Sequence, residues 1–249
     1  METLLVVLDV VFYSTFIIGL GSILLAKLQA PLLLKYGKTL QDVKTSSKGF
    51  SGYLQTLRVP KRCFQHFYFY STFIAALNLR QSNTVLAILV FLHSIRRLWE
   101  TLLVNKFGQN SFIHVSHYLV GLWFYSTVNY TVFTYQDGEH SVSLWLRLFS
   151  LLMFAMASWD QHQNHCHLAQ LRKYTLPTYG LFRVVGSPHY LDEVGIYLAL
   201  AMYTNSFKMW LCVVWVMVNL TISALETRYW YRRKFPATAP SYAIIPWVL

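Results

Sequence analysis

The sequence predicts an all-α integral membrane protein: a seven-transmembrane helix bundle with a cytosolic polar cap, forming one domain over residues 1–249. The first observation is composition. Of the 249 residues, 55% are hydrophobic and 12% are charged, and the mean hydropathy is +0.38, whereas soluble domains carry roughly 25% charged residues. The second is a series of seven apolar segments, and the third is that basic residues gather in alternate connections. A disordered chain and a coiled coil are excluded. The net charge of +11 is explained by membrane topology, so we expect no nucleic acid partner.

Seven segments are apolar enough to cross a bilayer, which takes about 20 residues, or fewer for a helix buried among others. They are Leu4–Leu25, Cys63–Leu79, Thr84–Val104, Ser111–Tyr135, Val142–Ser158, Tyr190–Thr204 and Met209–Thr227. The first follows Glu2 rather than a basic leader and has no clear cleavage site, so we expect a retained helix and not a signal peptide. No internal repeat or Gly/Ser linker interrupts the chain, which favours a single domain.

Lysine and arginine predict the orientation. The first connection carries Lys27, Lys35, Lys38, Lys44, Lys48, Arg58, Lys61 and Arg62; the fifth carries Arg172, Lys173 and Arg183; the tail carries Arg228, Arg232, Arg233 and Lys234. The second, fourth and sixth connections are poor in bases, with Arg80 in the second, none in Gln136–Ser141 and Lys208 in the sixth. By the positive-inside rule the N-terminus is lumenal and the C-terminus is cytosolic. The connection from Trp159 to His189 would then form the cytosolic cap.

Polar residues inside the third segment indicate a buried site, because ionisable groups within a membrane span usually face a cavity or the bundle interior. His93, Arg97 and Glu100 stand at i, i+4 and i+7, on one helical face. They form either an ion pair that joins two helices or the polar wall of a ligand cavity, and we favour the cavity. Arg96 and Arg97 beside one glutamate leave a surplus positive charge, which would suit a phosphate.

Two further patterns lie in and after the cap. Gln161, His165, Leu168 and Arg172 are spaced as one helical stripe, which favours a nucleotide over a solvated interfacial helix. Farther on, His189 lies one turn before Glu193 at the start of the sixth segment, either as a local pair that stabilises the helix or as a pair that orients a ligand.

The cysteine and histidine residues are not predicted to form a metal site. Cys63, Cys166 and Cys212 form no CxxC pair, so we expect reduced thiols. His162 and His167 fall on different helical faces, and no HExxH pattern occurs, so no metal is expected.

Five short motifs occur in the order of a known family. They are VPKRCFQHFY at Val59–Tyr68, HSIRRLWE at His93–Glu100, the stripe from Gln161 to Lys173, SPHYLDE at Ser187–Glu193, and Phe235-Pro236 followed by AIIPWVL ending at Leu249. This series resembles the polyprenol reductase (dolichol-forming) branch of the steroid 5-alpha-reductase family, from about residue 59 to 249.

The resemblance implies a reductase of the endoplasmic reticulum membrane that uses NADPH and acts on a long-chain polyisoprenoid in the lipid. It would saturate the α-isoprene double bond of polyprenol or polyprenal, giving dolichol for protein N-glycosylation. The implied cofactor-binding residues are Asn105, Gln161, His165, Arg172, His189, Glu193 and Tyr231, to which the polar third segment adds Arg97. Ser94 stands where steroid-acting members carry a tyrosine, which argues against a steroid substrate.

The chemistry of hydride transfer indicates which oxidation state of the substrate is reduced. Hydride adds to a carbon–carbon double bond only where the arriving negative charge can delocalise, so the conjugated aldehyde is the sensible acceptor. The protein must supply an electrophile at the aldehyde oxygen and a proton donor near the α-carbon. Candidates for these catalytic roles are His66, Tyr68 and His93, and we expect His189 to orient the cofactor.

Four rival functions remain open at this point. They are a very-long-chain trans-2-enoyl-CoA reductase, a steroid 5-alpha-reductase, a prenyl-related membrane methyltransferase and a seven-helix receptor. The nucleotide that co-purifies with the protein would separate the reductases from the methyltransferase and the receptor.

Overall fold

The computed structural model describes residues 2–29, 57–82, 84–108, 111–138, 141–172 and 175–248. Seven α-helices lie within these residues: α1 (Glu2–Gln29), α4 (Phe64–Gln81), α5 (Val85–Trp99), α6 (Val115–Thr134), α7 (Leu144–Gln170), α8 (Pro188–Thr204) and α9 (Phe207–Lys234). Shorter elements are β1 (Arg58–Pro60), η2 (Lys61–Cys63), the π-helical turn η3 (Glu100–Val104), β2 (Phe112–His114) and η4 (Gly180–Arg183). Of the basic residues used above, Lys35, Lys38, Lys44, Lys48 and Lys173 lie outside the described residues.

Each of the seven apolar segments overlaps one of these helices, and the largest differences from the predicted boundaries are at three helix ends. The helix of the fourth segment begins only at Val115, because Phe112–His114 pair as a strand. Helix α7 continues beyond Ser158 to Gln170, since Gln161 and His165 are buried against neighbouring helices and not solvated in a loop. Helix α9 likewise continues through its basic end to Lys234. By length and hydropathy, Glu2–Leu28 and Phe207–Lys234 are the described helices that could cross a membrane.

Local sequence sets the helix ends. The Thr84 and Ser143 hydroxyls accept hydrogen bonds of 3.3 Å from the backbone N–H groups of Ala87 and Leu146, which caps the first turns of α5 and α7. Pro188 occupies the start of α8, where a missing N–H costs nothing. The same helix ends at Asn205, whose φ of 50° is the left-handed conformation that closes a helix.

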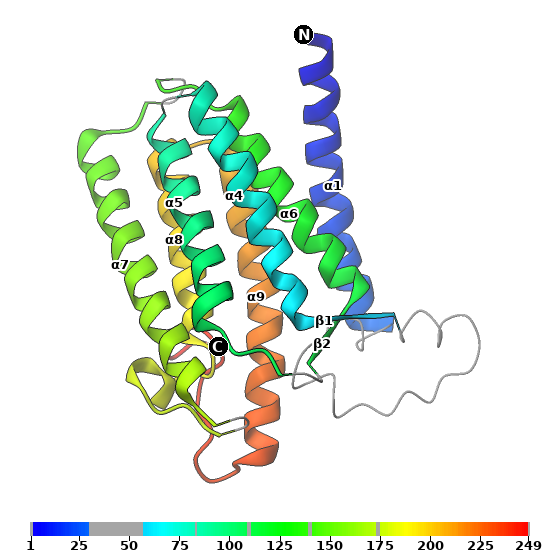
Figure 1. Ribbon diagram of the computed structural model, residues 1–249, viewed down its shortest axis with the longest axis vertical. Helices are drawn as coiled ribbons and strands as arrows, with labels where there is room; N and C mark the ends of the chain where they lie inside the picture. The colour runs from blue at the N-terminus through cyan, green and yellow to red at the C-terminus, as the bar shows by residue number, and fades with distance from the viewer. Residues whose placement is uncertain are drawn as a thin grey trace.

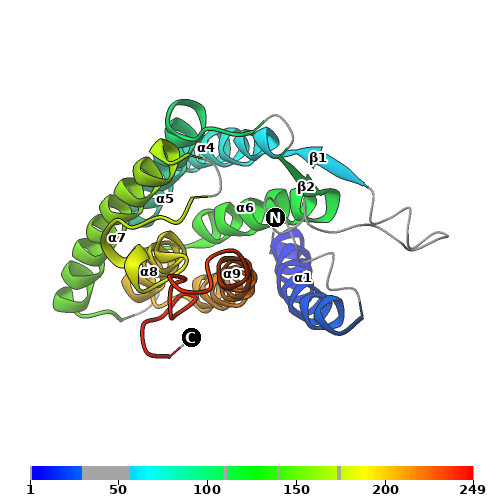
Figure 2. The same ribbon diagram turned by 90° about the horizontal axis from the view of Figure 1, so that it is seen from below.

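The helices run roughly along the long axis of the molecule (Figure 1), and seen from below α4 to α9 surround a common interior (Figure 2). Helix α1 stands to one side, beside α6 and α9. Buried apolar side chains such as Phe16, Tyr197 and Leu200 fill the core between them. Many large apolar side chains are exposed instead, among them Leu92, Phe149 and Leu152, as expected of a surface that faces lipid.

Two backbone contacts connect chain segments toward the lower end of the molecule in Figure 1. Strands β1 and β2 pair antiparallel, and Lys61 N–H donates to the Ser111 carbonyl at 2.7 Å, which joins the segment before α4 to the segment before α6. Farther on, Gly186 N–H donates to the Tyr242 carbonyl at 2.8 Å. The C-terminal segment thereby packs over the start of α8, where His189 lies.

Candidate active site

A cavity of about 430 Å³ lies between α4, η3, α6, α7, α8 and α9. Small-molecule sites usually have volumes of roughly 300–1,000 Å³. The polar lining consists of Lys61, Tyr68, Arg97, Thr101, Asn105, Lys106, His117, Tyr125, Gln161, His165, His189, Tyr190, Glu193, Asn219 and Ser223. The remaining lining is mostly apolar and includes Phe67, Phe124 and Trp215. The cavity therefore suits a ligand with a polar part and an apolar part.

Glu100 is the centre of the polar wall. Its side chain is fully buried at the first residue of the π-helical turn η3, a distortion that is frequent at functional sites. The Nη1 atoms of Arg96 and Arg97 donate to its two oxygens at 2.7 and 2.5 Å. The Nδ1 atoms of His162 and His165 lie 3.1 and 2.7 Å from the same carboxylate. Because four partners surround this buried charge, its position is rigidly defined.

Gln161 extends this network to α8. Its Oε1 accepts from Arg96 Nη2 at 2.6 Å, and its Nε2 donates to Glu193 Oε2 at 2.5 Å and to the His189 carbonyl at 3.1 Å. His93 lies behind this pair, with Nε2 3.5 Å from Glu193 Oε1. The sequence-distant Gln161 and Glu193 thus share one wall with the third predicted segment.

The expected surplus of positive charge is wrong. Glu100 pairs with Arg96 and Arg97, and the fold brings Glu193 beside this cluster, where it contacts Gln161 and His93. Two carboxylates therefore accompany the two guanidinium groups. All four Nη atoms of these arginines donate to neighbouring side chains: those of Arg96 to Glu100 and Gln161, and those of Arg97 to Glu100 and Tyr68. This wall is close to neutral and does not by itself present a phosphate site. The sequence could not reveal this, because Glu193 lies on another helix far along the chain.

The pair formed by Tyr68 and Arg97 places a phenol hydroxyl at the cavity wall. Arg97 Nη2 donates to the Tyr68 phenol oxygen at 2.8 Å, and the guanidinium carbon lies 4.9 Å from the centre of the same ring. Because the oxygen accepts from Arg97, the phenol proton is left to donate elsewhere. A neighbouring cation also stabilises negative charge that develops on a phenol or on its hydrogen-bond partner.

His165 is neutral in this wall. Burial, followed by the positive charge of Arg97, lowers the pKa of His165 to about 4. Its Nδ1 lies between Glu100 Oε2 at 2.7 Å and Arg97 Nη1 at 2.8 Å, so this nitrogen is held within the ion cluster. His165 therefore offers the cavity a neutral imidazole rather than a charge.

Seven of the eleven predicted site residues line the cavity: Tyr68, Arg97, Asn105, Gln161, His165, His189 and Glu193. The other four lie elsewhere. His66 is exposed and its Nδ1 lies 3.0 Å from the Tyr118 hydroxyl. His93 is outside the cavity lining and contacts the site through Glu193 and Arg96.

Arg172 is exposed, beyond the end of α7. A helical stripe therefore does not extend to Arg172, because α7 ends at Gln170. Tyr231 is buried and contacts the rings of Trp230 and Phe235, outside the cavity lining.

Sequence reasoning missed several lining residues. Asn219 is polar within an apolar segment, which is a signal that could have been used. Lys61 was used only to predict topology and Lys106 was given no role, and nothing in their local sequence shows that both reach the cavity. Glu100 was noted in the third segment, but its role as the centre of the network depends on contacts from α7.

A helical bundle with an apolar exterior, in which buried charged side chains line one cavity, is typical of a membrane-embedded enzyme. Residues 100–249 match the family described as 3-oxo-5-alpha-steroid 4-dehydrogenase, so the chain belongs to that family. It is an oxidoreductase of a membrane-bound reductase family, and the predicted resemblance is confirmed.

Three proteins of similar length that resemble this chain are named polyprenal reductase. The chain is 43% identical to the polyprenal reductase of Saccharomyces cerevisiae over 241 residues, covering 94% of this chain and 93% of the relative. It is 31% identical to the polyprenal reductase of Xenopus laevis, covering 82% and 80% of the two chains. With the human polyprenal reductase the identity is 28%, again covering 82% and 80%.

Proposed function

We propose that this protein is an NADPH-dependent polyprenal reductase that saturates the α-isoprene double bond of a long-chain polyprenal. The observation that carries the proposal is the Tyr68 phenol, which is held by Arg97 at the wall of a cavity that also has apolar lining. The relatives named polyprenal reductase, which match nearly the whole chain, support the same substrate.

The lining residues fit a dinucleotide. Asn105, Gln161, His165 and His189 bring amide and imidazole groups to one cavity, as recognition of a carboxamide and riboses requires. Lys61 and Lys106 add ammonium groups for phosphates, while exposed Arg172 would make a peripheral contact. NADPH, when bound, supplies the hydride that the β-carbon of the enal accepts.

Tyr68 acts at the aldehyde oxygen. As the double bond is reduced, negative charge passes through the conjugated system to this oxygen, where the phenol proton stabilises it. Arg97 polarises the phenol and is itself fixed by Glu100. An allylic alcohol has no such electron sink, so we propose that the aldehyde and not polyprenol is the direct substrate. Protonation at the α-carbon completes the saturated unit.

The position of Ser94 disfavours a steroid substrate. Ser94 is 1% exposed, its hydroxyl lies 2.8 Å from that of Ser71, and it is not part of the cavity lining. It therefore offers no group to polarise a steroid ketone. The apolar side chains Phe67, Phe124 and Trp215 would instead contact the first isoprene units.

We further propose that all seven helices cross the membrane of the endoplasmic reticulum as one domain, with the N-terminus lumenal and the C-terminus cytosolic. Lys27 in the last turn of α1, Arg172 after α7 and Arg232–Lys234 in the last turn of α9 are basic residues at corresponding helix ends. These ends lie toward the lower part of Figure 1. Such clustering supports a cytosolic lower end.

Isotope placement tests the reaction. Purified protein is given polyprenal and NADPH deuterated at the transferable hydride, and the product is analysed by mass spectrometry and NMR. The proposal predicts deuterium at the β-carbon of the saturated isoprene unit and a solvent proton at the α-carbon. Deuterium at the carbinol carbon, with the double bond intact, would show simple aldehyde reduction and overturn the proposal.

A further inference from the structure

Cys166 and His162 form a hydrogen-bonded series with Glu100, and neither the thiol nor His162 has a role in the proposed reduction. Its sulfur lies 3.5 Å from His162 Nε2, and His162 Nδ1 lies 3.1 Å from Glu100 Oε1. Because the carboxylate can only accept, Nδ1 carries the hydrogen and Nε2 presents its lone pair to the thiol. A nucleophile, a base and a carboxylate that fixes the base's tautomer is the arrangement that activates nucleophiles in acyl transfer.

The Cys166 thiol needs His162 as a base before it can act as a nucleophile. Burial, with a smaller effect from Glu100, raises the pKa of Cys166, so the thiol stays protonated near neutral pH. His162 is the group in contact that can take its proton as the sulfur attacks. Cys63 is a natural comparison, because it is similarly exposed but has no imidazole contact within the described part of the chain.

The cluster lies among aromatic side chains that face outward. The His162 ring is 5.4 Å from that of Trp99 and 6.4 Å from that of Trp159, and these tryptophans are 46% and 68% exposed. Exposed tryptophans at the end of an apolar helix are typical of the membrane–water interface. Cys166 follows them at the end of α7 that we propose to be cytosolic.

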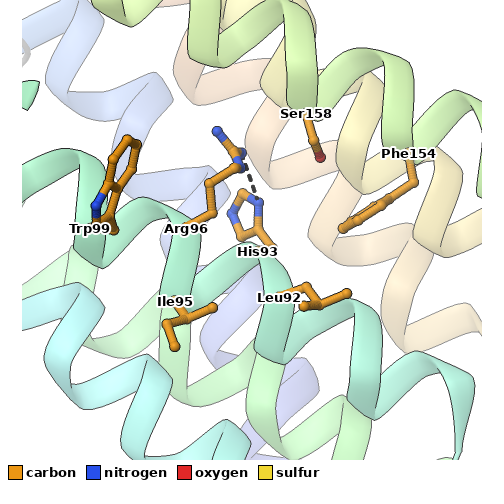
Figure 3. A pocket seen from close by; sticks show the side chains of 7 residues that line it. All are labelled: Leu92, His93, Ile95, Arg96, Trp99, Phe154 and Ser158. Atoms are coloured by element: carbon orange, nitrogen blue, oxygen red, sulfur yellow. Dashed lines mark hydrogen bonds between the residues drawn. The ribbon is translucent and has the colours of Figure 1, made fainter.

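An apolar groove begins next to this cluster. It lies between α5 and α7, has a volume of about 460 Å³, and is lined by Leu92, His93, Ile95, Arg96, Trp99, Phe154 and Ser158 (Figure 3). Leu92 and Ile95 are exposed at its rim, while the hydrogen-bonded side chains of His93 and Arg96 lie at its base. The rim residues place the groove on the surface that faces lipid.

The groove and the thiol share one row of α7. Phe154, Ser158, His162 and Cys166 follow at intervals of four residues. Cys166 lies two helical turns, about 12 Å, from Ser158 along the axis. One lipid acyl chain spans about half of the roughly 30 Å hydrocarbon core, or about 15 Å. A chain attached at Cys166 therefore reaches the groove.

We propose that Cys166 is a site of S-acylation and that the attached fatty acyl chain occupies the groove between α5 and α7. The sulfur attacks the carbonyl carbon of a long-chain acyl-CoA as His162 takes the thiol proton. The bond between this carbon and the coenzyme A sulfur breaks, and His162 returns the proton to the departing thiolate. The acyl chain then covers His93 and Arg96, which belong to the wall of the active site. Access to acyl-CoA rests on the proposed cytosolic placement of this helix end.

Intact-mass spectrometry of the full chain, incubated with palmitoyl-CoA before and after neutral hydroxylamine, tests the site. We expect one hydroxylamine-sensitive palmitoyl group, absent in Cys166→Ser and retained in the matched control Cys63→Ser. His162→Phe keeps a ring between the tryptophans but removes the base, and should slow acylation on the order of 100-fold. Equal labelling of Cys63 and Cys166, or an unchanged rate in His162→Phe, would overturn the proposal.

The groove is tested separately with Ile95→Trp, which fills it. Acetyl-CoA serves as a donor without a chain to dock, so its reaction reports the thiol chemistry and the integrity of the fold. We expect Ile95→Trp to lose at least tenfold of the palmitoylation rate while acetylation is retained. Loss of both reactions would be resolved with Leu92→Trp, which fills the same groove from the next turn. If palmitoylation of a variant that still acetylates equals that of the unaltered chain, the groove is not the acyl site.

Discussion

The Tyr68 phenol accepts a 2.8 Å hydrogen bond from Arg97, whose other terminal nitrogen binds the buried carboxylate of Glu100. One guanidinium thus connects the rigid centre of the polar wall to the group that we propose to polarise the substrate. The phenol is positioned by α5 and η3 although it belongs to α4.

Replacing Tyr68 by phenylalanine removes the proposed electrophile while keeping the ring over Arg97. We expect kcat for polyprenal to fall on the order of 100- to 1,000-fold, as for loss of one oxyanion donor, with KM for NADPH changed less than twofold. Turnover is normalised to folded, detergent-stable protein. Tyr70→Phe is the matched control, because its hydroxyl binds Ser126 at 2.9 Å outside the cavity lining. Equal losses in both variants would remove Tyr68 from the mechanism.

His66 and His189 were both predicted from the sequence, and the structure separates them. His66 is exposed and outside the cavity lining, so His66→Gln should keep near-normal specific activity. His189 lines the cavity, so His189→Gly should nearly abolish reduction while the protein still accumulates, since a misplacement of about 1 Å can cost on the order of 100-fold in rate. The opposite order of effects, measured as turnover per folded molecule, would contradict this placement.

Glu100→Gln should destabilise the whole fold. The change leaves Arg96 and Arg97 without their carboxylate, and breaking a buried ion pair typically costs about 3–5 kcal/mol. The melting temperature in detergent should fall on the order of 10 °C. Glu226→Gln, at a residue near the end of α9 that is not part of this network, serves as the control. A melting temperature within 2 °C (roughly 1 kcal/mol or less) of the unaltered chain would show that the network is not needed for stability.

His165 makes stability depend on pH. Its pKa is lowered from 6.5 to about 4 in the folded protein, so the unfolded chain binds more protons between these values. Its contribution to stability is therefore complete above pH 6.5 and is lost as the pH falls toward 4, by about 3 kcal/mol in total. The free energy of unfolding, measured across this pH window, should change less steeply with pH in His165→Gln than in the unaltered chain. Identical slopes would contradict a neutral, buried imidazole.

Cofactor discrimination should depend on the cavity lysines more than on Arg172. Lys61→Gln should raise the KM for NADPH about tenfold and leave that for NADH nearly unchanged, since Lys61 is half-buried in the cavity lining and a hydrogen bond to a charged group contributes about 1.5–3 kcal/mol. Exposed Arg172 should contribute less, because surface ion pairs are worth about 0–1 kcal/mol. Initial rates with both nucleotides decide this. A larger effect of Arg172→Ala would place the phosphate outside the described cavity.

Hydrophobicity alone was enough to place the seven helices, because each is a long apolar run. The sequence was less informative at the helix ends, where α7 and α9 continue through polar residues that tertiary contacts bury or support. Helical spacing correctly predicted that Gln161 and His165 lie on one face. It could not show that His93, unlike these two residues, lies outside the cavity lining. The predicted surplus of positive charge was wrong for the same reason. Glu193 lies near Glu100 only because α8 packs against α5 and α7.

The most direct test of the proposed function compares two substrates that differ only in oxidation state. Purified full-length protein is incubated with NADPH and either polyprenal or polyprenol of equal chain length, and the saturated products are quantified by mass spectrometry. The proposed role of Tyr68 predicts rapid conversion of polyprenal and none of polyprenol unless an oxidising enzyme is added. Conversion of polyprenol alone, with no aldehyde formed, would contradict it.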